Sequence, residues 1–168
     1  MAGVPGLVMD EYKSIKSPNG GAYANVPLPR SRVDAARWVR DHSDPDDIVA
    51  TNVHCVGYYG DLCDSRSFWL SAYAERSVLV EGWAFAPRLA TVGLTAFWDP
   101  EKLRRNDEAF IEPTAEGLRE LRERYGVRWL VVDRTVGKEP PALGELAVRR
   151  YDNGRLAVYE LTPPSPSI

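Results

Sequence analysis

The sequence predicts an α/β domain with a mixed, mainly parallel sheet that is flanked by helices and carries a C-terminal β-hairpin at its edge. Three amphipathic helical segments alternate along the chain with three apolar, β-rich runs. The last run, residues 127–133, is apolar on both faces at its centre, as strands of parallel sheets are. Alternating segments on both sides of Asp152-Asn153-Gly154 then predict the hairpin.

The chain of 168 residues is expected to form one domain, over residues 31–162. Residues 1–30 are rich in Gly, Pro, Ser and Asn and show no sustained period, which indicates a flexible linker or extended arm. Residues 163–168, Pro-Pro-Ser-Pro-Ser-Ile, are expected to be a disordered tail.

The first helix is predicted over residues 32–42, with Ser31 as its N-cap. Pro45 ends it, since the residue before a proline avoids helical angles. A buried strand, residues 48–53, then leads into the cysteine segment. The residues expected to share one face of this helix are Ala35, Trp38, Val39 and His42.

A second helix is predicted over residues 67–76, capped by Asp64 or Ser65 and followed by a strand over residues 77–83. Three side chains of this helix are expected to face inward: Trp69, Ala72 and Tyr73. Residues 84–113 are interrupted by prolines and are expected to be irregular, with a short helix near residues 99–107.

The third helix is predicted over residues 115–125, between an N-cap at Thr114 and a stop at Gly126. Its apolar positions Leu118, Leu121 and Tyr125 lie at helical spacing. The strand of residues 127–133 follows directly, and the hairpin closes the domain over residues 146–161.

The charge balance argues against two classes of partner. Lys and Arg number 21 against 24 Asp and Glu, for a net charge of -3. This gives neither the basic face that binds nucleic acid nor attraction to an anionic lipid surface. No run approaches the roughly 20 apolar residues of a membrane span, and the first residues lack a signal-peptide pattern, so this fragment is expected to be soluble. Nucleotide-binding motifs are absent, and no cofactor is expected.

Both cysteines lie in one segment, where Cys55 and Cys63 enclose seven residues that include Gly57 and Gly60. The glycines allow the segment to fold back on itself, so a structural disulfide is the favoured interpretation. Closing such a loop stabilises a fold by roughly 2–3 kcal/mol in the chain-entropy model.

Other chemistries stay open for these cysteines. Zinc would need the local set His54, Cys55, Cys63 and Asp64, but neighbouring residues of a strand point to opposite faces, so no metal site is expected. A thiol nucleophile would need His42 as its base. The spacing does not match a redox Cys-x-x-Cys pair, and two free cytosolic thiols remain an alternative.

Carboxylates at predicted element ends are weak catalytic candidates, chiefly Asp64, Glu81 and Asp133, with Glu75 nearby. A pair of carboxylates would suit glycoside hydrolysis. The alternative is structural: helix capping by Asp64, and ion pairs of the others with Arg66, Arg76 or Arg134.

Aromatic residues flank the irregular segment: Trp83, Phe85, Phe97 and Trp98. Such rings either stack on sugars or pin a long loop onto the core. Arg66 and Trp83 are the candidate ligand-binding residues, because arginine clamps a phosphate or uronate bidentately and an indole stacks on a sugar ring.

Four stretches together resemble a known class of domain: "ARWVRDHSDPDDIVATNVHC", "CDSRSFWLSAYAERSVLVEGWAF", "FWDPEKLRRNDEAFIEPT" and "YGVRWLVVDRT". They are similar to the C-terminal soluble region of large actinobacterial polytopic membrane proteins that look like glycosyltransferases of the C superfamily. The resemblance covers roughly residues 30–162.

The resemblance implies an extracytoplasmic accessory domain that is inactive by itself, since in such proteins the membrane half carries the catalytic carboxylates. Its implied partners are the membrane-embedded half of the same protein and an acceptor glycan or polyprenyl-phosphate sugar. Residues 1–30 would then be a juxtamembrane linker. The alternatives are a stand-alone hydrolase that uses Asp64, Glu81 or Asp133, and a structural or interaction domain without a ligand.

Overall fold

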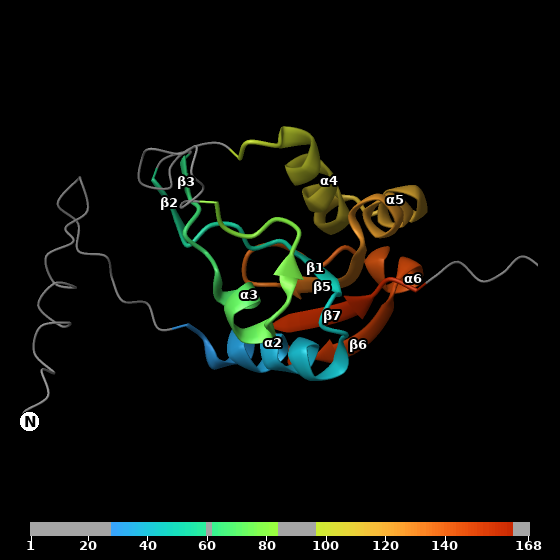
Figure 1. Cartoon of the computed structure of the whole chain (residues 1–168), viewed down its shortest axis with the longest axis horizontal. Coiled ribbons are helices and arrows are strands. Elements are labelled where there is room, and N and C mark those ends of the chain that lie inside the picture. The colour runs from blue at the N-terminus through green and yellow to red at the C-terminus, as the bar shows by residue number, and fades with distance from the viewer. Residues whose placement is uncertain (1–27, 60–61, 84–96, 163–168) are drawn as a thin grey trace, which may run out of the picture.

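The computed structural model describes residues 28–59, 62–83 and 97–162, and within them a five-stranded mixed sheet lies between two layers of helices (Figure 1). The strand order is β4-β1-β5-β7-β6. The predicted α/β class is therefore confirmed. The predicted tail and all but the last three residues of the predicted arm lie outside the described residues.

Parallel and antiparallel pairing divide the sheet into two parts. β4 (Ser77–Val78), β1 (Ile48–Thr51) and β5 (Val127–Asp133) run parallel to one another. β7 (Leu156–Glu160) pairs antiparallel with β5, and β6 (Val148–Asp152) pairs antiparallel with β7. The C-terminal hairpin lies at the sheet edge, as predicted.

The central strand β5 supplies side chains to both layers. Trp129 and Val131 lie in the apolar cluster on one face, and Leu130 and Val132 in the cluster on the other. This alternation follows from the period of two in a strand. Both faces are covered, which explains why the strand is apolar throughout its centre.

In the described ranges, five helices form the two outer layers (Figure 1). α2 (Arg30–His42) and α3 (Trp69–Ala74) cover one face of the sheet. α4 (Pro100–Ile111), α5 (Ala115–Tyr125) and the short α6 (Leu143–Leu146) cover the other. The sequence did not predict α6, and α4 extends past the short helix expected there into a stretch read as irregular.

The start of α2 differs from the prediction. The helix begins at Arg30, after Pro29, and Ser31 lies inside its first turn with a buried hydroxyl that has no hydrogen-bond partner. The N-cap assignment of Ser31 was therefore wrong. On the predicted face, Ala35 and Val39 are fully buried and Trp38 is partly buried, whereas His42 is exposed and stacks on Trp38.

α3 is shorter than predicted and turns a different face inward. It begins at Trp69, which is buried together with Leu70 and Ala74. Ala72 and Tyr73, which were expected inside, are exposed. The two strands predicted on either side of this helix are also shorter than expected, since β1 ends at Thr51 and β4 at Val78.

The boundaries of α5 match the prediction. The Thr114 hydroxyl accepts a hydrogen bond from the backbone N–H of Gly117 at 3.0 Å, and Gly126 ends the helix with a φ of 70°. Leu118 and Leu121 are buried as expected. A capping hydroxyl and a left-handed glycine are strong local signals, which is why both ends could be placed.

A second, two-stranded sheet consists of β2 (Gly57–Tyr59) and β3 (Leu62–Asp64), which pair antiparallel with Tyr58 opposite Cys63. This hairpin lies away from the five-stranded sheet (Figure 1). Two strands of three residues are too short to be stable alone. Some other constraint must therefore hold the hairpin in place.

None of the helices within the described ranges is both long enough and apolar enough to cross a bilayer.

Candidate functional site

The disulfide predicted for Cys55 and Cys63 is present, with a Cα–Cα distance of 5.4 Å. Val56 also donates a backbone hydrogen bond to the Asp64 carbonyl at 2.8 Å, which closes the same loop. Both sulfurs are consumed by the bond. A zinc–thiolate site, a thiol nucleophile and a pair of free thiols are therefore all incompatible with this structure.

Asp64 comes directly after the disulfide at the end of β3 and is 3 % exposed. It pairs with Arg66: the guanidinium Nε donates to Oδ1 at 2.6 Å, and a second N–H donates to Oδ2. A two-point contact of this kind fixes both side chains. This ion pair was not predicted for Asp64, whose expected structural role was helix capping. Neither Asp64 nor Ser65 caps α3, because the helix begins at Trp69 with Phe68 at its N-cap position.

Glu81, which follows α3 in the chain, caps the start of this helix instead. Its carboxylate accepts the backbone N–H of Leu70 at 2.6 Å and of Ser71 at 3.2 Å, two groups that a helix start leaves unsatisfied. Burial raises the pKa of Glu81 above its usual value, while the hydrogen bonds from Ser71 and Leu70 act in the opposite direction.

Gly82 allows this arrangement by its lack of a side chain. A Cβ at position 82 would lie 2.5 Å from the carbonyl oxygen of Ser65 and 2.6 Å from that of Ser67. Only glycine permits such a close approach between this segment and the start of α3.

Asp133 ends β5 and is 1 % exposed. Its carboxylate accepts from the Nε of Arg32 at 2.6 Å and from the backbone N–H of Thr135 at 2.8 Å. The Asn52 side chain, at the end of β1, bonds both the N–H and the carbonyl of Asp133. These contacts tie α2 to the carboxyl ends of the two central parallel strands.

Arg76 and Arg134 were expected to pair with the other candidate carboxylates, but both have different partners. Arg134 pairs with Glu139 and Asp152, which holds the pKa of Asp152 down at about 2. Arg76 donates to the backbone carbonyls of Arg40 and Ser43 at the end of α2. The three carboxylate candidates thus have three different sets of partners, and no contact joins any two of them.

Two of the aromatic residues, Trp83 and Phe97, are buried together with Val80 in a small apolar cluster. Trp83 is 6 % exposed and Phe97 is 7 % exposed, and their ring centroids are 5.2 Å apart. Trp98 is the exposed member of the group, at 51 %. Phe85 lies outside the described residues. The proposed stacking of a sugar on Trp83 remains a prediction, but little of that ring is accessible.

A histidine–carboxylate pair was not predicted from the sequence. The Nε2 of His54 lies 2.8 Å from Oδ1 of Asp107 on α4, and since a carboxylate only accepts, Nε2 carries the proton. The Asn106 side chain donates to the Thr51 carbonyl and to the same Asp107 oxygen. The local sequence around either residue does not predict a contact between positions 53 residues apart.

The remaining polar atoms of this cluster are unsatisfied. Both Nδ1 of His54 and Oδ1 of Asn106 are buried and have no hydrogen-bond partner. A base oriented by a carboxylate is a familiar catalytic arrangement. Here, however, the nitrogen that would accept the proton is covered, so this arrangement presents no base to a substrate.

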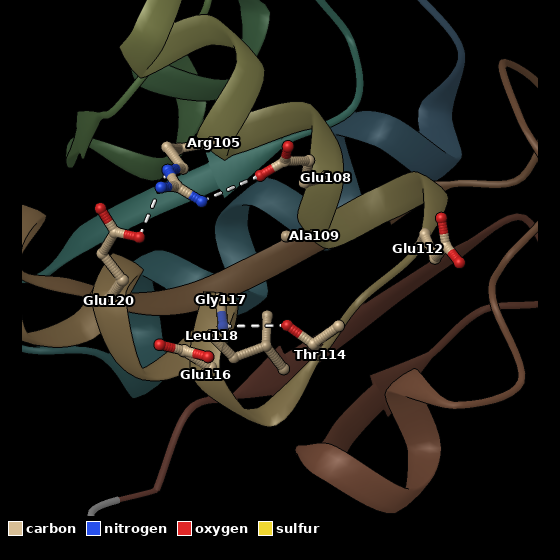
Figure 2. A pocket seen from close by; sticks show the side chains of 9 residues that line it. All are labelled: Arg105, Glu108, Ala109, Glu112, Thr114, Glu116, Gly117, Leu118 and Glu120. Carbon is tan, nitrogen blue, oxygen red and sulfur yellow. Dashed lines mark hydrogen bonds and ion pairs between the residues drawn. The ribbon is translucent and has the colours of Figure 1, made fainter.

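A polar cavity of about 500 Å³ lies between α4 and α5 (Figure 2). Arg105 bridges Glu108 of its own helix and Glu120 of α5, at 3.4 Å and 3.3 Å. Glu112 and Glu116 also line it. The dominant charge is negative, and the ion pairs across the cavity connect the two helices.

A second cavity, of about 300 Å³, runs along the edge strand β4. It is lined by seven consecutive residues of the chain, 76–82, together with side chains from α3 and from the start of α4. Of the sequence-predicted site residues, Glu81 lines it.

Neither cavity contains a cluster suited to a metal. Within the parts of the chain that the structure describes, no three His, Cys, Asp or Glu side chains gather in a way that could hold an ion.

No model of a known protein family matches the sequence. A search of curated protein sequences gives no significant match.

Proposed function

We propose that this chain is an extracytoplasmic accessory domain of a membrane glycosyltransferase-like protein, without catalytic activity when isolated. Its partners are then the membrane-embedded half of the same protein and an acceptor glycan or polyprenyl-phosphate sugar. The disulfide between Cys55 and Cys63 is the observation that carries this proposal.

The disulfide supports the extracytoplasmic location because such bonds persist in oxidising compartments and are rare where glutathione keeps thiols reduced. It closes a loop with a sequence separation of only 8 and holds a hairpin that the main sheet does not support. The bond is thus part of the fold, as a structural disulfide is.

The carboxylates argue against the rival hydrolase. A general acid or base must be able to exchange its proton with a substrate. Asp64 is held by Arg66, Asp133 is held by Arg32 and Thr135, and Glu81 caps α3. Each group is already committed to stabilising the fold.

The rival interaction domain would need a large exposed apolar patch. The large apolar side chains exposed in the described residues come from six separate segments: Val56, Tyr73, Trp98, Ile111, Val136 and Val148. Isolated exposed apolar residues are ordinary on monomeric proteins. No two of these side chains belong to the same described helix or strand, which argues against a contact surface formed by one apolar element.

An activity screen distinguishes the accessory domain from the hydrolase. Purified protein is incubated with a panel of chromogenic glycosides between about pH 4 and 8, the range in which carboxyl pairs work. We expect no turnover above buffer. Turnover that Glu81→Gln or Asp64→Asn abolishes, in a variant that folds normally, would establish the hydrolase instead.

Vesicle flotation tests the ligand. Phosphatidylcholine vesicles with and without a polyprenyl-phosphate hexose are mixed with the protein and floated on a gradient. We expect flotation only with the lipid-linked sugar, and less of it for Arg66→Lys, which keeps the charge but loses the bidentate geometry. Arg119→Lys, on the exposed surface of α5, is the matched control. Equal flotation with both vesicles would refute the lipid-linked sugar as ligand.

A further inference from the structure

The cavity beside β4, here termed the slot, follows seven consecutive residues of the chain at the edge of the sheet. Residues 76–82 line it in succession, and β4 is the last strand on its side of the sheet. Phe68 and Ser71 of the α3 region line it together with Phe97 and Trp98, which precede α4, and Lys102 in the first turn of α4. The exposed Trp98 ring is therefore part of its wall.

The ladder between β1 and β4 fixes which backbone groups face this slot. Val49 is paired with Val78, and Leu79 donates to the Val49 carbonyl at 2.8 Å. In a parallel ladder the residues on either side of the paired one make the bonds. The N–H and carbonyl of Val78 therefore point away from β1, and no residue of the described ranges bonds them there.

The two edges of the sheet differ in their protection. The opposite edge, β6, carries Arg149 and Arg150 and a register irregularity between Arg149 and Tyr151. Charged side chains and bulges are the usual means by which proteins prevent further strands from adding to an edge. In the described residues β4 has the short length of two residues as its protection, without a charged side chain or a bulge in the paired positions, and the outward backbone groups of Val78 are unpaired.

The walls of the slot exclude a second copy of this edge. Pairing two β4 strands would require both edges to project, whereas each lies between the α3 region and the start of α4. A slot of about 300 Å³ has room for a few residues of one extended chain and not for another sheet with its own walls.

The charge at the slot favours an acidic occupant. Lys102 lines it, as does Arg76, whose guanidinium N–H groups donate to backbone carbonyls at the ends of α2 and α3. Among the described lining residues the only acidic one is Glu81, which is 7 % exposed and directs its carboxylate to the α3 amides. The Lys102 amine lies 4.0 Å from Asp99, a loose contact that leaves it able to bind a second carboxylate.

We propose that the slot along β4 binds an extended polypeptide segment, which adds to the sheet as a sixth strand and places an acidic side chain at Lys102. Backbone hydrogen bonds to Val78 supply the affinity, and Trp98 and Lys102 supply the selectivity. The inference does not depend on the proposed function, because it rests on the β4 edge and the side chains that line the slot.

A peptide display selection tests the proposal. Random peptides of about eight residues, a common strand length, are selected on the folded chain. Peptides that also bind Val78→Pro are removed, since proline lacks the N–H that faces the slot. We expect enriched peptides that carry an acidic residue at a constant position. A selection that enriches nothing would overturn the proposal.

Affinity measurements on an enriched peptide then identify the contacts. We expect roughly 10-fold weaker binding to Val78→Pro, as lost backbone hydrogen bonds predict, and little change for the matched control Val78→Ala, which keeps the N–H. Lys102→Glu should reverse the preference for an acidic residue. Equal binding to all of these variants would refute the proposal.

A measurement on the peptide covers the case in which Val78→Pro does not fold. Methylating single peptide nitrogens should weaken binding to the unaltered protein only at every second position, the period of a strand. Uniform effects would contradict strand addition.

Three other occupants are outcomes that overturn the proposal. Protection of the Val78 amide from hydrogen exchange in the free chain would show that a segment of this chain covers the edge. Dimerisation that Val78→Pro abolishes would assign the edge to a second copy. Competition by a soluble uronic-acid oligosaccharide that Val78→Pro does not weaken would assign the slot to a glycan.

Discussion

Buried charged side chains hold distant parts of this chain together. Glu81 caps a helix that begins 12 residues before it, Asp133 anchors α2 through Arg32, and Asp64 holds Arg66 beside the disulfide. The sequence identified all three carboxylates as notable, but it assigned Asp64 to helix capping and not to the ion pair with Arg66. It did not predict the cap by Glu81 or the contact between His54 and Asp107, because both depend on how the chain folds back.

Replacing Glu81 by Gln should change how stability depends on pH. Burial raises the pKa of Glu81 in the folded state above the unfolded value near 4.5, so its favourable contribution is present at low pH and is lost as pH rises through the folded pKa. The free energy of unfolding of the variant should therefore improve relative to the wild type as pH rises from about 4 to 7.

Urea unfolding at a series of pH values measures this difference, and Glu75→Gln, an exposed carboxylate at the end of α3, is the control. The stability of Glu81→Gln relative to the wild type should rise with pH. A relative stability that stays constant or falls as pH rises would contradict the assignment.

Asp152 should show the opposite dependence. Arg134 holds its folded pKa at about 2, below the unfolded value of 3.8, so its contribution is present at neutral pH and lost as pH falls through about 2. Asp152→Asn should cost about 1 kcal/mol at neutral pH, since the pair is partly exposed, and almost nothing near pH 2. Acid unfolding curves beside those of Asp46→Asn, in the exposed turn before β1, give the comparison; equal shifts for the two variants would count against the ion pair.

At the scale of elements, patterns of sufficient length were predictable and short segments were not. β5, α5 and the C-terminal hairpin have long periodic patterns with clear end signals, and their positions match. β2 and β3 have three residues each, too few for alternation to be recognised. The start of α2 was misplaced because a serine near a helix start is a common N-cap, but here Pro29 precedes the first turn.

Two substitutions compare a true cap with the residue mistaken for one. Thr114→Ala removes a hydroxyl that binds the Gly117 amide, and should cost about 1 kcal/mol of stability. Ser31→Ala removes a buried hydroxyl without a partner, and should be neutral or stabilising. Thermal unfolding of both variants measures this; an equal loss for Ser31→Ala would restore its role as a cap.

Removing the disulfide should loosen the β2–β3 hairpin first. The double variant Cys55→Ser/Cys63→Ser should lose roughly 2–3 kcal/mol of stability, because the hairpin has no other cross-link. Hydrogen exchange should accelerate at β2 and β3 while the β5 amides stay protected. Faster exchange throughout the sheet, with no preference for the hairpin, would contradict a local role.

At the scale of the whole molecule, the fold class followed from the sequence and the function did not. The alternation of helices and strands follows from periodicity that any α/β domain shares, whereas the strand order β4-β1-β5-β7-β6 was not predicted and comes from the structure. What sets this domain apart is a cross-linked hairpin, carboxylates committed to structure, and one sheet edge where the outward backbone groups of Val78 are unpaired. The first two support an extracytoplasmic accessory domain, and the third supports a polypeptide partner.

The location of the disulfide in the cells that make this protein tests the account most directly. Intact cells are treated with a membrane-impermeant maleimide before and after a membrane-impermeant reductant, and the mass of the protein is measured. The account predicts labelling of Cys55 and Cys63 on intact cells only after reduction. Labelling without reductant, and only after lysis, would place two free thiols inside the cell and contradict the proposed function.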